Sequence, residues 1–139
     1  MSFSTIYDIA GSAMAAQTVR LNAVASNLAN ADVVSGSEQT GYRAKRPVFE
    51  TVMVDKGNGT QGAMVRVKEV LESDAPLQRR YEPNHPLANK EGYVFYSQVN
   101  PVEEMADMMS ASRNFETNVD VMTRARSMQQ SILRLGQTG

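Results

Sequence analysis

The chain contains no cysteine among its 139 residues, which excludes disulfide bonds, thiol catalysis and metal sites built on thiolates. It contains a single histidine and carries a formal net charge of -1 at pH 7. A chain this close to neutrality gives no electrostatic reason to bind nucleic acid or an anionic membrane. Composition therefore disfavours cysteine enzymes, disulfide-bonded modules and basic nucleic-acid binders.

Long apolar runs are also missing. No stretch approaches the roughly eighteen consecutive apolar residues that a membrane-spanning helix requires, so we expect no direct membrane insertion. The beginning of the sequence lacks a basic segment followed by an apolar one, so we predict no cleaved secretory signal. A chain of this length can form one domain with a modest core.

The N-terminal segment, from about Ser4 to about Ala31, has the period of an amphipathic helix. Its Ser4 hydroxyl is a candidate N-cap. Apolar residues recur every three or four positions, at Ile6, Ala10, Ala13, Leu21, Val24 and Leu28. Because many residues on this stripe are small, another helix could pack closely against it.

A polar line runs along a second face of the same helix. It contains Arg20, Asn27 and Asn30, which return to nearly one face at this spacing. One interpretation is a solvated face, which periodicity alone favours. The other is a set of amide side chains that fix the register between packed helices, as a buried Asn does in coiled coils.

The C-terminal segment has a clearer helix start. Asn100 is a candidate N-cap, Pro101 suits the first helical position, and Glu103 and Glu104 suit the positive end of the helix dipole. Gly136 predicts the end of the helix. The apolar line between them contains Met105, Met108, Ser112, Phe115, Val119, Met122, Ala125, Met128, Ile132 and Leu135.

Such a helix of about 35 residues would be about 50 Å long, which a domain of this size cannot cover along its whole length. Methionine is abundant on its stripe. The methionines could fill an ordinary core, or they could form an adaptable surface that packs against several non-equivalent neighbours. The stripe also drifts around the helix, so we predict a packed multi-helix contact rather than a two-stranded coiled coil.

The middle of the chain has the pattern of short strands separated by turns. Loops are predicted at Val33–Gly41 and at Glu82–Pro86, where two prolines oppose regular structure. An Asn-Gly pair within Lys56–Gly59 predicts a hairpin turn. The predicted strands are Val48–Val54, Met64–Leu71 and Tyr93–Tyr96.

These segments predict an α+β fold with long N- and C-terminal helices, within residues 1–32 and 100–139, that pack together. Residues 33–99 form a small β-rich middle region, which needs a helix to cover one face. An amphipathic helix cannot bury its stripe alone, so the terminal helices must contact each other, a neighbouring chain, or both. This layout indicates a building block of an assembly rather than an enzyme with its own pocket.

Candidate chemistry is sparse. His85 has only Glu82 close by in the sequence, and no second ligand motif joins them. No nucleophile elbow or phosphate-binding loop is present. We therefore predict no catalytic, cofactor-binding or metal site, and expect His85 to be a turn residue that makes one hydrogen bond.

Arg43, Lys45 and Arg46 form a short basic cluster. A nucleic-acid site would need a matching motif and a basic chain, which this sequence lacks. The first interpretation is therefore solvated charge. The second is a set of salt bridges to neighbouring subunits, for which the candidate acidic partners are Asp8, Glu103, Glu104 and Asp107.

Four stretches in order carry a resemblance to a known family. Ala16–Asn30, with the pattern AQxxRLNxxASNLAN, resembles the N-terminal signature of bacterial flagellar rod and hook proteins. Three further stretches make the chain similar to the proximal rod members of that family. They are Tyr42–Glu50, then Tyr81–Ala88 with Glu91–Val94, then Asn100–Met105 with Ala111–Glu116. The short middle region also fits a proximal rod protein better than the longer distal rod or hook proteins.

The resemblance implies a structural subunit that polymerises with copies of itself and other rod proteins. The product would be a hollow periplasmic shaft, which transmits torque and forms an export channel with the terminal helices in its wall. Inner-membrane ring proteins and the flagellar type III export apparatus are the further partners it implies. Export would occur without a cleaved signal peptide, and no cofactor is implied.

The resemblance makes the two helical lines the expected subunit interface. Arg43, Lys45 and Arg46 are the candidates for inter-subunit salt bridges. The expected interface residues are Leu21, Val24, Asn27, Leu28, Asn30, Met105, Met108, Phe115, Val119, Met122, Met128 and Ile132.

An alternative function is a soluble helical adaptor that binds a partner helix through the methionine-rich stripe. It accounts for the C-terminal helix but not for the N-terminal signature. The two terminal helices are far apart in sequence, so their pairing must overcome loop-closure entropy. We therefore also predict that both are poorly ordered in the free monomer and become ordered on assembly.

Overall fold

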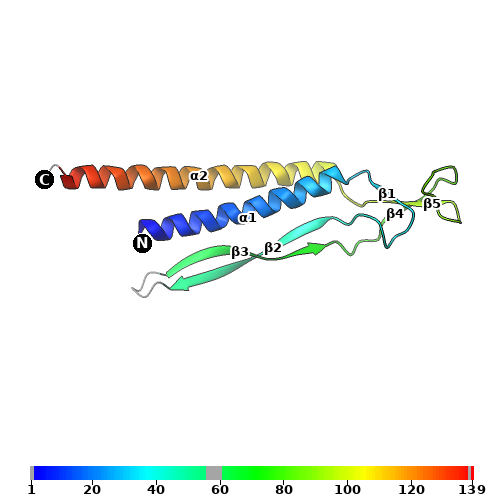
Figure 1. The fold of residues 1–139 in the computed structure, drawn as a ribbon, viewed down its shortest axis with the longest axis horizontal. Coiled ribbons are helices and arrows are strands. Elements are labelled where there is room, and N and C mark those ends of the chain that lie inside the picture. The colour runs from blue at the N-terminus through cyan, green and yellow to red at the C-terminus, as the bar shows by residue number, and fades with distance from the viewer. Residues whose placement is uncertain (1, 56–60, 138) are drawn as a thin grey trace.

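The computed structural model describes residues 2–55, 61–137 and 139. It confirms the α+β class, with two long helices packed together and a small antiparallel β region (Figure 1). Helix α1 lies between helix α2 and the β2–β3 hairpin, and the two chain ends lie at the same end of the elongated molecule. The elements are α1 (Phe3–Ala29), β1 (Val34–Ser35), β2 (Lys45–Asp55), β3 (Gln61–Glu72), β4 (Gln78–Tyr81), β5 (Tyr93–Tyr96) and α2 (Pro101–Gln137).

Helix α1 begins two residues earlier than the sequence predicts, because its N-cap is Ser2 and not Ser4. The Ser2 hydroxyl caps it by accepting a hydrogen bond from the Thr5 amide at 3.3 Å, and Ser4 lies within the first turn, so the Ser4 prediction is wrong. At the other end, the Asn30 amide donates to the Ser26 and Asn27 carbonyls. The buried apolar residues of the helix are small: Ala10, Ala16, Ala23 and Val24.

Helix α2 starts as its sequence predicts. The Asn100 side-chain oxygen accepts a hydrogen bond from the Val102 amide at 3.1 Å, and Pro101 occupies the first helical position. The helix ends at Gln137 and passes through Gly136, so the predicted end is wrong by one residue. Gly136 does not adopt the positive φ with which a glycine ordinarily ends a helix.

The first two predicted strands are confirmed and extended as β2 and β3. They pair in antiparallel register from Lys45 with Glu72 onward, with a shift between Val48 and Phe49. The predicted turn at Lys56–Gly59 lies outside the described residues. Helix α1 covers one face of the hairpin, and the Ser12 hydroxyl accepts a hydrogen bond from the Val65 amide at 3.2 Å.

The second sheet has the strand order β1-β5-β4 and lies at the end of the molecule away from the chain termini (Figure 1). Tyr93–Tyr96 is confirmed as a strand, whereas the predicted loop at 33–41 contains the two-residue strand β1. The four residues of strand β4 are mostly polar and all exposed, so its sequence has no alternating pattern that predicts it. It pairs antiparallel with β5, and the Arg79 guanidinium lies 3.6 Å from the centre of the Tyr93 ring on that strand.

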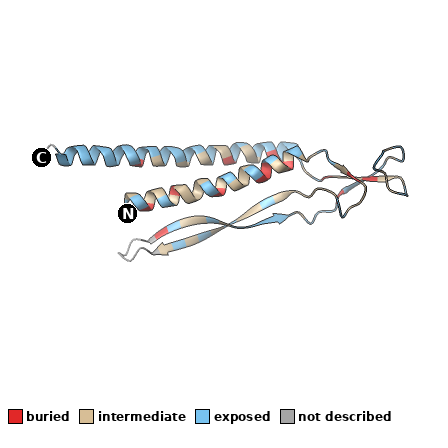
Figure 2. Ribbon diagram, in the orientation of Figure 1, coloured by how far each residue is buried: buried red, intermediate tan, exposed pale blue. Residues whose placement is uncertain are grey.

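Most of helix α2 is exposed (Figure 2). Its buried residues are Glu104, Ala111 and Ala125. Helix α2 packs along α1, and at its first turn Glu104 also meets Arg46 of β2. The prediction that one chain cannot cover this helix along its length is therefore confirmed. The core is a thin line of small residues between α1 and α2, with further buried positions such as Val94 and Leu77 near the second sheet.

Candidate assembly site: a polar junction and an exposed helix

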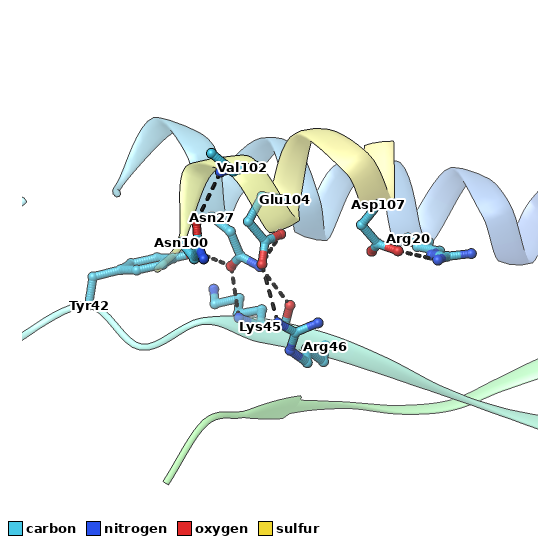
Figure 3. Close-up of polar contacts among 9 residues, drawn as sticks. All are labelled: Arg20, Asn27, Tyr42, Lys45, Arg46, Asn100, Val102, Glu104 and Asp107. Atoms are coloured by element: carbon cyan, nitrogen blue, oxygen red, sulfur yellow. Dashed lines mark hydrogen bonds and ion pairs between the residues drawn. The ribbon is translucent and has the colours of Figure 1, made fainter. Parts of the chain in front are cut away.

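The side chain of Asn27 lies at the centre of a buried polar cluster (Figure 3). Its oxygen accepts hydrogen bonds from the Lys45 amide at 2.8 Å and the Tyr42 hydroxyl at 2.9 Å. Its nitrogen donates to the Lys45 carbonyl at 2.9 Å and to the Glu104 carboxylate at 3.0 Å. We call Asn27, Tyr42, Lys45, Arg46 and Glu104 the polar junction. One amide side chain thus joins α1, the start of β2 and the start of α2.

Glu104 supplies the charge of the polar junction. It is 2% exposed, and its carboxylate receives the Asn27 amide on one oxygen and lies 3.5 Å from the Arg46 guanidinium on the other. Its place in the first turn of α2 also puts it at the positive end of the helix dipole. Removing a partner of a buried carboxylate leaves a charge without compensation, so this arrangement strongly favours one geometry.

A second ion pair joins the two helices next to the polar junction. Arg20 of α1 pairs with Asp107 of α2, one turn after Glu104, and both side chains are about three-quarters buried. Far along the helix pair, the Tyr7 hydroxyl and Gln129 are joined by a long hydrogen bond of 3.4 Å. The contacts of Asn27 and Arg20 therefore join the helices near the start of α2, and the order of these pairings shows that the helices are antiparallel.

The structure divides the predicted interface residues into two groups. Within one chain, Val24 and Asn27 are buried. Intermediate burial is found for Leu21, Leu28, Asn30, Met108, Phe115 and Met122. The exposed group consists of Met105, Val119, Met128 and Ile132, with exposures of 56%, 39%, 59% and 54%. The first group has contacts in its own chain, whereas the exposed group lies on the surface of α2.

The basic cluster has partners within its own chain. Arg46 pairs with Glu104, and Arg43 lies 3.9 Å from Glu38 while donating to the Ser73 and Ala75 carbonyls. Lys45 contributes its backbone amide and carbonyl to the polar junction. Of the candidate acidic partners, Glu104 therefore meets this cluster inside one subunit.

The polar line of α1 does not simply face solvent. Asn27 is 1% exposed and fixes the register of α1 against α2, which is the second of the two interpretations. Asn30 instead donates to the Ser26 carbonyl of its own helix at 2.8 Å. Tyr42 was not predicted as a site residue, because its contact with Asn27 arises only when residues 30–44 fold back onto α1. For Glu104, the sequence offers one local signal of a special role: it is an acidic residue in the first turn of a helix that starts with Asn100-Pro101.

His85 is a half-buried turn residue, as the sequence predicts. Its Nδ1 accepts a hydrogen bond from the Leu87 amide at 3.0 Å. Within residues 2–55 and 61–137, no group of three or more histidine, cysteine or acidic side chains could hold a metal ion. The helices in that part of the chain are also too short or too polar to cross a membrane.

Two family models match the segments that form the helix pair. The model "Flagella basal body rod protein" matches residues 8–36, and the model "Flagellar basal body rod FlgEFG protein C-terminal" matches residues 90–135. The first match covers most of α1 and the second most of α2. Both halves of the polar junction around Asn27 and Glu104 therefore lie in matched segments.

Similarity to individual proteins extends over the whole chain. The chain is 48% identical over 137 residues to "Flagellar basal-body rod protein FlgC" of Salmonella typhimurium, covering 99% of this chain and 100% of that protein. The protein of the same name in Escherichia coli O157:H7 is 47% identical with the same coverage. That of Bacillus subtilis is 34% identical over 143 residues, covering 94% of this chain and 95% of that protein. The chain therefore belongs to the FlgC family of flagellar basal-body rod proteins.

Proposed function

We propose that this chain is a structural subunit of the proximal flagellar rod. It polymerises with copies of itself and with other rod proteins into a hollow periplasmic shaft that transmits torque and encloses an export channel. The observation that carries this proposal is the similarity to FlgC proteins from one end of the chain to the other. No catalytic step is part of the proposal.

The exposure of α2 supports an assembled state. Met105, Met128 and Ile132 are each more than half exposed, and Leu135 is 74% exposed. Burying apolar side chains of this size is worth about 1.5–3 kcal/mol each, so a surface of this kind gains from a neighbouring subunit. An isolated adaptor with one partner would need only one such surface, whereas here the exposed apolar positions lie at both ends and on several sides of the helix.

We assign the predicted interface residues two different roles in this function. The exposed residues Met105, Val119, Met128 and Ile132 contact neighbouring subunits. The buried or half-buried residues hold α1 and α2 in the geometry that presents that surface. Arg43, Lys45 and Arg46 lie at the edge of the polar junction, where Arg46 has a 60% exposed side chain that can also meet an acidic group of a neighbour.

The same function implies a location and further partners. We propose that the subunit resides in the basal body in the periplasm, after export by the flagellar type III apparatus without a cleaved signal peptide. Proteins of the inner-membrane ring are the proposed neighbours at the base of the rod. The near-neutral composition and the lack of cysteine are compatible with this route.

Mass spectrometry of detergent-washed hook–basal bodies from the source bacterium tests the proposal. The soluble periplasm and cytoplasm are analysed alongside. We expect peptides of this chain to be enriched with the basal body at several copies per particle. Peptides found only in the soluble fractions would contradict the rod function and favour the adaptor, which should purify as a stable species with one stoichiometric partner.

A further inference from the structure

Strand β4 forms an open edge of the β1-β5-β4 sheet, far from the helix pair's free end (Figure 1). Among the described strands it pairs with β5 alone, and all four of its residues, Gln78–Tyr81, are exposed. Leu77, just before the strand, is 7% exposed and anchors it to the rest of the chain. The edge is therefore held in place while its side chains remain accessible. An open edge carries backbone N–H and C=O groups to which a further strand can bond.

The hydrogen-bond ladder identifies the backbone groups that face outward from β4. The Glu82 amide donates to the Gly92 carbonyl at 2.9 Å, in register with the pairs of β4 and β5, so this pair is of the hydrogen-bonded type. Hydrogen-bonded and non-hydrogen-bonded pairs alternate along an antiparallel ladder. Arg79 and Tyr81 therefore belong to the other type, and their amides and carbonyls point away from β5.

The backbone of β5 supports this assignment. Tyr93 is opposite Tyr81 in the register, yet its amide donates to the Asn89 side chain at 2.9 Å and its carbonyl accepts from the Asn89 amide at 2.9 Å. The Tyr93 backbone thus points away from β4, as a non-hydrogen-bonded pair requires. Within residues 2–55 and 61–137, no hydrogen bond occupies the outward backbone groups of Arg79 and Tyr81. Both residues consequently have donors and acceptors available at the edge.

Each face of this edge presents an arginine that rests on a tyrosine of β5. The guanidinium of Arg79 lies 3.6 Å from the centre of the Tyr93 ring, and that of Arg80 lies 4.6 Å from the centre of the Tyr96 ring. Adjacent residues of a strand point to opposite faces, so the two cations lie on opposite sides of the sheet. Cation–π attraction favours these positions over the rings. Arginine and tyrosine are also residues that protein interfaces favour.

The two cations are little neutralised within the chain. Arg79 lies 3.6 Å from Glu91, but these side chains are 52% and 73% exposed, and an exposed ion pair of this kind is weak. Among the side chains that the structure describes, Arg80 pairs with no carboxylate. The strand itself contains two positive charges and no negative one. Its charge therefore complements an acidic partner.

We propose that the open edge of β4 binds an extended acidic segment of a partner protein, which adds to the sheet as a further strand. The outward backbone groups of Arg79 and Tyr81 supply the main-chain hydrogen bonds that such strand addition uses. Two adjacent acidic residues in the segment place one carboxylate on each face, beside Arg79 and Arg80. Tyr81, which is 64% exposed, packs against the added strand.

This partner is not a second copy of the chain. The sequence has one adjacent pair of acidic residues, Glu103 and Glu104, and both belong to helix α2. The inference goes beyond the proposed rod function and does not use the helix pair. It adds a docking site for a different protein at the opposite end of the molecule from the chain termini (Figure 1).

Peptide binding to the full-length chain tests the proposal. The probes are eight-residue peptides of alternating threonine and valine that carry either Glu-Glu or Lys-Lys at the centre. A third peptide has the Glu-Glu centre with both glutamate amides N-methylated, so it keeps the charge but loses main-chain donors. Titrations are followed by NMR through the chemical shifts and hydrogen exchange of the backbone amides of residues 78–82.

We expect the Glu-Glu peptide to shift the amides of Arg79 and Tyr81 and to slow their hydrogen exchange. The Arg80 amide already bonds to β5 and should exchange slowly throughout. The Lys-Lys and N-methylated peptides should bind about tenfold more weakly, because they reverse the cross-strand charge pairs or remove the main-chain bonds. Arg79→Glu combined with Arg80→Glu should reverse the preference between the two charged peptides, and Arg126→Glu, which changes an exposed arginine of α2, should not.

Equal binding of the Glu-Glu and Lys-Lys peptides, or no saturable binding of either, would overturn the proposal. The arginines would then serve only to protect a free edge from pairing. Rapid exchange of the Arg80 amide in the free chain would overturn it as well, because the docking edge would not be preformed. These outcomes leave the rod function standing, since that function is tested separately by the protein content of basal bodies.

Discussion

The two ends of the helix pair are held together in different ways. At one end, Asn27 and Glu104 are almost completely buried, and the Asn27 amide bonds to Tyr42, Lys45 and Glu104. At the other end, Tyr7 and Gln129 share one long hydrogen bond, and Ile132 is 54% exposed. At the junction end, contacts within the subunit bury the side chains, whereas side chains at the distal end of α2 stay exposed.

This contrast separates two tasks that one long helix performs. The polar junction fixes the orientation of α2 relative to α1 and β2, because buried hydrogen bonds and a buried charge tolerate little change in geometry. The apolar surface beyond it then gains most from contacts with other subunits. Substitutions at the junction should therefore change the stability of the isolated chain, and substitutions at the distal end should change assembly instead.

Asn27→Ala should have the largest effect on the isolated chain. It removes all four hydrogen bonds of the amide and leaves the Glu104 carboxylate buried with Arg46 alone. We expect the free energy of unfolding to fall by about 3–4 kcal/mol. Urea unfolding followed by circular dichroism measures this loss. Asn30→Ala is the matched control, because that amide only bonds within its own helix, and equal losses for both variants would refute the role of the polar junction.

Phe115→Asp should have the next largest effect. Phe115 is half-buried near the middle of α2, and an aspartate there places an unpaired charge in an apolar contact. We expect a loss of about 2–3 kcal/mol in unfolding free energy, and subunits that are exported but do not assemble. Unfolding experiments, export assays and motility check this, with Thr117→Asp on the exposed side as the control. Normal motility of the Phe115 variant would indicate that this face meets solvent in the rod.

Ser12→Ala should have a smaller effect on the contact between α1 and the hairpin. The substitution removes the oxygen that accepts the Val65 amide, the side-chain hydrogen bond by which α1 holds β3. The expected loss is about 1 kcal/mol, the usual value for one partly buried hydrogen bond. Ser131→Ala, which removes only a bond to the Ser127 carbonyl within α2, should leave the urea midpoint almost unchanged. A similar midpoint shift in both variants would count against this attachment of the hairpin.

Ile132→Asp should have the smallest effect on the free chain and a large one on assembly. The side chain is already exposed, so the unfolding free energy should change by no more than about 0.5 kcal/mol. The variant should nevertheless be missing from purified basal bodies, which immunoblotting can show. Gln130→Asp adds the same charge near the same helix end and should assemble normally. Assembly of Ile132→Asp at natural levels would contradict the role of the distal end.

The sequence predicts the parts of this fold that depend on local signals. The Asn100-Pro101 start of α2 is visible because capping chemistry involves adjacent residues, and the strands of the hairpin are visible because their side chains alternate. Strand β4 is not predictable in this way, since it is polar and is held by pairing with the more distant β5. The end of α2 was also mispredicted, because the helix continues through Gly136 to Gln137 instead of stopping at the glycine.

The polar junction shows the limit of the same reasoning. Helical spacing places Asn27 on a polar line, but it does not distinguish a solvated amide from a buried one. Burial depends on Tyr42 and Glu104, which reach Asn27 only through tertiary folding. Exposure of the distal end of α2 was predictable, by contrast, because a helix of this length exceeds what the remaining chain can cover.

Amide hydrogen exchange on the dilute chain, compared with purified basal bodies, tests the contrast between the two ends most directly. The sequence alone predicts that both terminal helices are poorly ordered in the dilute chain, and the buried polar junction limits this expectation to the distal end of α2. In the dilute chain we therefore expect residues around Asn27 and Glu104 to be protected, and residues 126–137, whose side chains are exposed, to exchange rapidly. In basal bodies, residues 126–137 should become protected. Equal, strong protection at both ends of α2 in the dilute chain would contradict this account, as would rapid exchange of residues 126–137 in the assembled rod.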